Sequence, residues 1–168
     1  MERTLINLFN NSVELYPDNP LMYEKRDGVY TAATYTQARK QVRLTAAGLL
    51  ALGLDKGDRV TLLSEGRNDW VFSELGVLFT GGVTVPLSIK LKEPSELEFR
   101  ISHSGSRFVI VSGAQLPKLL AIKNNLSQVE KIIVLDDIRQ SDPDIITMQN
   151  LRDMGAGYLN DSEKTLAS

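Results

Sequence analysis

The clearest pattern of hydrophobic and polar positions along the chain predicts one strand–helix–strand unit. Residues 59–64, RVTLLS, form a short apolar run that is typical of a buried strand. Apolar residues then recur with helical spacing over residues 70–78, after Asn68, which can cap a helix, and before Gly81-Gly82, which can end it. Residues 83–86, VTVP, predict a second strand that its proline terminates. A crossover of this length is right-handed, so the two strands should be parallel.

The remaining pattern alternates strands and helices. That alternation predicts an α/β fold: a mostly parallel sheet with helices on both faces, and a small N-terminal hairpin outside it. The other predicted elements are a helix opened near Thr4, a hairpin of residues 21–25 and 29–33, a helix from the Thr34–Gln37 capping box to Gly53, a helix beginning at Pro94, strands at 108–112 and 131–135, a helix at 116–124, and a last helix from Thr147 to Met154.

The last stretch, residues 155–168, differs from the rest. It contains Gly155, Gly157 and a polar run at 160–164, and we expect neither a strand nor a closing helix there. The sequence therefore divides into an α/β subdomain at 1–154 and a linker or tail at 155–168. A chain end without docking contacts is poorly anchored, so we expect weak order near its last residue, Ser168.

Composition and charge narrow the function. The chain has 168 residues, 42% hydrophobic and 24% charged, the balance of an ordinary globular domain. Its formal net charge of −2 argues against a general nucleic-acid surface. The chain has no cysteine, which excludes disulfides, thiolate metal sites and a cysteine nucleophile. No apolar run approaches a membrane span and the N-terminus lacks a signal-peptide pattern, so a cytoplasmic location is expected.

Four features that could carry chemistry have plainer structural interpretations. Gly81-Gly82 lies between a helix and a strand, whereas a phosphate cradle must open a helix. His103, the single histidine, sits at a predicted helix end, where a cation suits the dipole. The acidic run from Asp136 to Asp144 lacks the spacing of a calcium loop. Trp70 has apolar neighbours at helical spacing, which favours core packing over a ligand platform.

Position in the fold gives a better indication of a site. In open parallel sheets, ligands bind outside the carboxyl ends of the strands. Those ends here are residues 64–67, 87–90 and 112–115, which offer hydroxyls, glycines and the cations Arg67 and Lys90, with Lys118 nearby. This edge could accept an anionic ligand. The alternative, that these are merely solvated loop residues, stays open.

Several segments of the chain form a combination that is specific even though each segment alone is modest. They are LINLF and YPDNP (5–9 and 16–20), TYTQ (34–37), AAGLLALGLDKGDRV (46–60), SEGRNDW (64–70) and GGVTVPL (81–87). Together they resemble the N-terminal part of the adenylate-forming, AMP-binding acyl-CoA synthetases, and the resemblance covers nearly the whole chain. "SEGRN" and "PLSIKL" look most like bacterial long-chain fatty acid–CoA ligases.

The resemblance implies an enzyme that uses ATP, magnesium and CoA to activate a fatty acid through an acyl-adenylate. The family's Ser/Thr/Gly-rich phosphate loop ending in Pro-Lys-Gly is absent, as are its later nucleotide and magnesium motifs and its lysine-bearing C-terminal domain. We therefore expect an inactive N-terminal fragment with no catalytic and no metal-binding residues of its own. The resemblance implies proximity to the CoA nucleotide for Ser88, Lys90, Gly113 and Lys118.

Further expectations follow from the fragment interpretation. No tight ATP, CoA or magnesium binding is expected of the fragment, and the fatty acid would be met by the full-length enzyme. That enzyme could also attach peripherally to membranes. A face left uncovered by the missing part should favour self-association. Two alternatives stay open: an autonomous nucleotide-binding module of flavodoxin type, and a protein-interaction domain.

Overall fold

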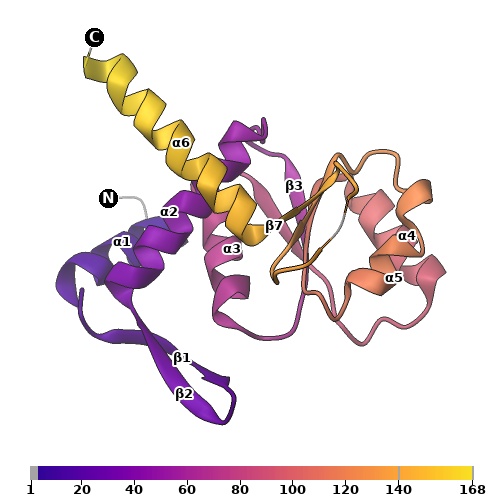
Figure 1. The fold of residues 1–168 in the computed structure, drawn as a ribbon, viewed down its shortest axis with the longest axis horizontal. Coiled ribbons are helices and arrows are strands. Elements are labelled where there is room, and N and C mark those ends of the chain that lie inside the picture. The colour runs from indigo at the N-terminus through magenta and orange to yellow at the C-terminus, as the bar shows by residue number, and fades with distance from the viewer. Residues whose placement is uncertain (1–3, 140, 168) are drawn as a thin grey trace.

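The computed structural model describes the backbone of residues 4–139 and 141–167, and their side chains except those of residues 26 and 162–167. A five-stranded parallel sheet forms the centre, in the strand order β4-β3-β5-β6-β7, and β1 and β2 form a separate antiparallel hairpin (Figure 1). The strands are β1 (Pro20–Arg26), β2 (Val29–Thr34), β3 (Arg59–Leu63), β4 (Val83–Pro86), β5 (Ser106–Val111), β6 (Lys131–Val134) and β7 (Ile145–Thr147). The helices are α1 (Leu5–Leu15), α2 (Tyr35–Ala51), α3 (Asn68–Phe79), α4 (Pro94–Ser104), α5 (Leu116–Leu120) and α6 (Met148–Ala167), with a 3₁₀ turn at Lys123–Asn125.

The sheet confirms the predicted α/β class. All four predicted sheet strands pair in parallel, and the hairpin lies outside them. The fifth strand, β7, was not predicted, because its three residues are too few to show a pattern. It pairs with β6 and extends the sheet on the side away from β4.

Side chains alternate between the two faces of the sheet, as strand geometry requires. On one face Val60, Leu62 and Phe108 pack under α2, α3 and α6. On the other face Leu63 and Val109 pack under α4 and α5. Figure 1 shows these two helical layers on opposite sides of the strands. The predicted covering of both faces is therefore confirmed.

Local signals set most helix ends. The side chain of Thr4 accepts a hydrogen bond from the backbone N–H of Asn7 at the start of α1. Thr34 and Gln37 form the predicted capping box of α2.

Two predictions about the helices were inexact. The helix expected at 116–124 is the short α5 followed by a 3₁₀ turn. Asn68 is the first residue of α3 rather than its cap, and its backbone N–H donates to the carboxylate of Glu24 in the hairpin.

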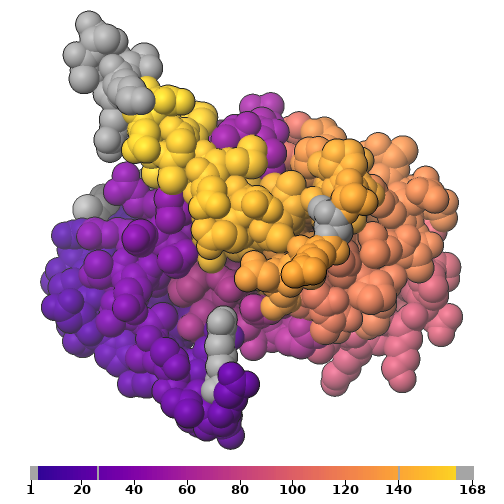
Figure 2. Space-filling view, viewed as in Figure 1, coloured from indigo at the N-terminus to yellow at the C-terminus, as the bar shows by residue number. Residues whose placement is uncertain are grey.

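The largest departure concerns α6, which continues to Ala167 where the sequence predicted a tail from residue 155. Thr147 caps the helix as predicted, since its hydroxyl accepts from the backbone N–H of Asn150. The helix then crosses α2, and the two lie side by side in Figures 1 and 2. At the crossing a Cβ on Gly155 would lie 2.1 Å from the backbone oxygen of Leu44, and one on Gly48 would lie 2.2 Å from that of Leu151.

These glycines permit an approach that no other residue allows, so Gly155 is a helix-packing residue and not a sign of a linker. The polar run at 160–164 also lies within α6. The expectation of weak order near Ser168 concerns a residue outside the described part of the chain. The division of the chain into 1–154 and 155–168 as functional units stays a prediction.

Candidate functional site

The candidate site lies at the carboxyl ends of the parallel strands, where the sequence predicted it. Arg67 follows β3, Gly113 follows β5 and Asp136 follows β6, and the sheet brings the three together. Arg67 donates to the carboxylate of Asp136 at 2.6 Å. The backbone N–H of Gly113 donates to the other oxygen of the same carboxylate at 2.7 Å. Asp136 therefore joins two strand ends, and its charge offsets that of Arg67.

This ion pair continues into the helical layer. Asp69 lies 3.8 Å from Arg67, and Arg152 of α6 donates to Asp69 at 2.7 Å. The side chains of Asp69 and Arg152 are 15% and 12% exposed, so water screens this pair less than a surface pair. The predicted cation Arg67 is thus engaged by two carboxylates. It is less available to an anionic ligand than the sequence suggested.

A second polar contact joins β3 to the loop after β5. The amide of Gln115 donates to the carboxylate of Glu65 at 2.5 Å. The neighbouring Ser112 hydroxyl, and then Gln115, stabilise this carboxylate, and the pKa of Glu65 lies below its ordinary value. The charged form of Glu65 is therefore favoured over the protonated form.

An open cleft of about 530 Å³ lies beside Glu65, between the ends of β3 and β4. Its walls combine apolar and hydroxyl-bearing side chains. Trp70 packs against the core as predicted, and it also lines this cleft. The lining residues are Ser64, Glu65, Gly66, Trp70, Pro86, Leu87, Ser88 and Ile89.

The loop after β4 carries two of the predicted site residues. Ser88 and Lys90 are exposed, and the Ser88 hydroxyl accepts a hydrogen bond from the backbone N–H of Lys90 at 3.2 Å. Lys118 reaches this loop from α5, and its ammonium group donates to the carbonyls of Ile89 and Leu91. The structure thus brings Ser88, Lys90 and Lys118 to one loop, whereas Gly113 contacts Asp136 instead.

The other candidate residues have structural contacts. His103 lies in the last turn of α4 and stacks on Phe99, with ring centroids 5.3 Å apart. The acidic loop is paired with lysines: Lys123 bonds to Asp142, whose pKa it lowers, and Lys131 bonds to Asp144 at 3.1 Å. Within the described part of the chain, no group of three or more potential metal-ligating side chains comes together.

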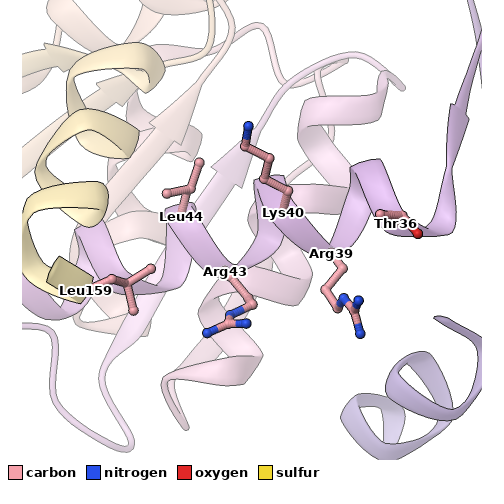
Figure 3. A pocket seen from close by; sticks show the side chains of 6 residues that line it. All are labelled: Thr36, Arg39, Lys40, Arg43, Leu44 and Leu159. Carbon is pink, nitrogen blue, oxygen red and sulfur yellow. The ribbon is translucent and has the colours of Figure 1, made fainter. Parts of the chain in front are cut away.

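Sequence reasoning missed a groove where α6 passes α2 (Figure 3). Its cations are the α2 side chains Arg39, Lys40 and Arg43, and Arg39 also pairs with Glu14 of α1 at 2.5 Å. Figure 3 shows Lys40 directed away from the two arginines. Leu159 of α6 closes one end. Because residue 159 lay in the predicted tail, no sequence signal placed it beside α2.

Comparison with known proteins identifies the family of this chain. The sequence profile of the family described as "AMP-binding enzyme" matches residues 9–162. The chain belongs to the AMP-binding enzyme family. The family resemblance inferred from the sequence is therefore confirmed, and the matched residues include the cleft, its neighbouring ion pairs and the α2–α6 crossing.

Two curated relatives of this chain are named as CoA ligases. The 4-hydroxybutyrate–CoA ligase 2 of Metallosphaera sedula is 33% identical over an alignment of 129 residues that covers 70% of this chain and 23% of that protein. The long-chain-fatty-acid–CoA ligase ACSBG1 of Bos taurus is 26% identical over 155 residues, 91% of this chain and 21% of that protein. The chain thus spans between a fifth and a quarter of the length of these relatives.

Solved structures agree on the fold. The coronafacic acid ligase of Pectobacterium brasiliense superposes with a TM-score of 0.79 over 88% of this chain and 29% of its own length, at 21% identity. At that identity the likeness concerns the fold alone. Among the described residues, no helix has the length and apolar content needed to cross a membrane.

Proposed function

We propose that this chain is the N-terminal part of an ATP-dependent fatty acid–CoA ligase. The observation that carries the proposal is the family match over residues 9–162, together with the ligase names of the relatives. The long-chain fatty acid is the substrate we propose, because ACSBG1 and the mycobacterial FadD15 enzymes, 39–40% identical over 70–71 residues, carry that name. We place the enzyme in the cytoplasm.

The proposed reaction has two steps. The fatty-acid carboxylate attacks the α-phosphate of ATP, which gives an acyl-adenylate and releases pyrophosphate. The thiol of CoA then attacks the acyl carbon, which forms the thioester and releases AMP. Magnesium would offset phosphate charge in the first step. The described residues offer no acidic cluster for that ion and the sequence has no phosphate-binding glycine loop, so we assign both to other segments of the ligase.

The contribution of this chain would be a surface for CoA. The exposed Ser88 and Lys90 offer a hydroxyl and a cation at the end of β4, where they could meet a phosphate of the CoA nucleotide. Gly113 and Lys118, which the resemblance also placed near this nucleotide, hold Asp136 and the loop carbonyls respectively. Their role would be to support the loops at the carboxyl ends of the strands.

The test measures ATP–pyrophosphate exchange with fatty acids of increasing chain length. We expect none from the purified 168-residue chain, and exchange from the product of the complete reading frame. A phosphate-loop sequence ending in Pro-Lys-Gly should follow Ser168 in that frame. Protein-dependent exchange by the chain alone would contradict the assignment of the chemistry. A frame that stops at Ser168 would favour an autonomous binding module.

A further inference from the structure

The loop between β4 and α4 forms a tight turn whose tip is Lys90. The backbone N–H of Leu91 donates to the carbonyl of Ser88 at 3.2 Å, which closes a β-turn over residues 88–91. Leu87, Ile89 and Leu91 pack against the core beneath α4 and α5. Ser88 and Lys90 alternate with them and are exposed. The turn therefore has an anchored apolar side and a polar side toward solvent.

Lys118 holds this turn through two hydrogen bonds to its backbone. Its ammonium group lies 2.8 Å from the carbonyl oxygen of Ile89 and 3.1 Å from that of Leu91, the two carbonyls on either side of Lys90. The lysine stands on α5, whose Leu116 packs in the same apolar cluster as the turn. An ammonium group has three donors and can bind two carbonyls of one turn at once.

This geometry gives the two lysines different tasks. The Lys118 charge is directed at backbone oxygens, whereas Lys90 extends from the turn that Lys118 holds. Removing Lys118 would leave the carbonyls of Ile89 and Leu91 without their charged donor. Hydrogen bonds from a charged donor are stronger than neutral ones, so water would not fully replace them. The orientation of Lys90 would loosen while its own charge remained.

We propose that Lys118 is a positioning residue for the CoA nucleotide: it holds the Ser88–Leu91 turn so that Lys90 meets a phosphate group. This rests on the proposed function in one respect, the identity of the ligand. The clamp itself is a statement about this chain. Lys118 therefore acts on CoA affinity through Lys90 and has no part in forming the acyl-adenylate.

The first experiment tests the clamp in the 168-residue chain. Amide hydrogen exchange is followed over residues 88–92 in the wild type and in Lys118→Met, which keeps most of the apolar stem. Lys118→Arg retains donors, and Lys92→Met removes an exposed charge from the same loop. We expect faster exchange in Lys118→Met alone, with protection largely restored in Lys118→Arg. Unchanged protection in Lys118→Met would overturn the clamp.

The second experiment uses the complete ligase and separates the two steps. In Lys118→Met we expect the KM for CoA to rise roughly tenfold, as misplacement of a binding group does, with pyrophosphate exchange unchanged. Lys90→Met should raise the same KM, Lys118→Arg should recover it, and Lys92→Met should match the wild type.

The outcomes separate this inference from the proposed function. A wild-type KM for CoA in Lys118→Met would overturn the positioning role. An equal loss of pyrophosphate exchange and of thioester formation in that variant would also overturn it. An equal effect of Lys92→Met would reduce it to general electrostatics and would also overturn it. Absence of all ligase activity in the wild type would refute the proposed function and the CoA assignment together. The amide hydrogen exchange of the 168-residue chain would still decide the clamp.

Discussion

Replacing Gly155 by alanine tests the crossing of α6 over α2. The new Cβ would lie 2.1 Å from the backbone oxygen of Leu44 and 2.8 Å from the backbone nitrogen of Gly48. A Cβ atom essentially never lies closer than 3.0 Å to such an atom, so the helices must separate by about 1 Å. Neither neighbour is a flexible side chain that could turn aside. Gly157 is the matched control, because it lies on the same helix and its Cβ would meet nothing within 4 Å.

The two substitutions should change stability in opposite directions. Alanine gains about 1 kcal/mol over glycine inside a helix, and this gain is common to both variants. At position 155 the forced separation costs up to about 3 kcal/mol, the upper part of the range for overpacking. We therefore expect Gly155→Ala to lower the free energy of unfolding by about 2 kcal/mol, and Gly157→Ala to raise it by up to about 1 kcal/mol.

Urea unfolding, followed by circular dichroism and by the fluorescence of Trp70, measures both changes. Thermal unfolding is the second measurement. For a chain of this size, its midpoint should fall by roughly 4–8 °C in Gly155→Ala and rise by roughly 2–4 °C in Gly157→Ala. Equal stabilisation by both substitutions would refute the crossing. Residues from 155 onward would then behave as the linker that the sequence suggested.

Three further predictions concern caps, pH and association. Thr34→Ala should cost about 1 kcal/mol through the lost capping box of α2, and Thr36→Ala, which is exposed beside it, should cost less in the same urea titration. Arg107 bonds to Glu130 and lowers its pKa, so the carboxylate stabilises the fold at neutral pH and the benefit disappears as the pH falls through the depressed folded-state pKa. Glu130→Gln should thus be less stable than the wild type at pH 7 and should approach it in acid; a difference independent of pH contradicts this. The apolar side chains of Leu5, Leu8 and Leu15 on α1 are exposed, so sedimentation should show concentration-dependent association of the isolated chain. Leu8→Gln, or co-expression with the remainder of the enzyme, should reduce that association. A monomer at every concentration would favour an autonomous domain.

Local and periodic signals predicted the fold well where they were strong. The strand at 108–112 and the capping box at Thr34 depend on neighbouring residues, and both were confirmed. The start of α3 was misjudged because Glu24, 44 residues earlier, satisfies the N–H of Asn68. Gly155 suggested a linker because the backbone it packs against lies on α2. In each error a distant partner overrode a local preference.

The position of the polar loops was predicted, but the pairing of their charges was not. The parallel sheet placed the polar loops at one edge, as the general rule for such sheets requires. Whether a cation there is available depends on its partner, and Asp136 lies 69 residues from Arg67 in the sequence. Lys118 likewise finds its carbonyls 27 and 29 residues away. Types of residue can be read from a segment, but charge pairing requires the assembled fold.

The packing of α6 on α2 also determines the order in which this chain can be completed on the ribosome. Thr45 on α2 contacts Met148 on α6, 103 residues later. At synthesis rates of about 5–20 residues per second, the interval between them is roughly 5–20 seconds. During that interval the side of α2 that packs against α6 has no cover, and neither has the part of the sheet beneath α6. The emerging chain therefore presents an apolar surface to chaperones until α6 has been made.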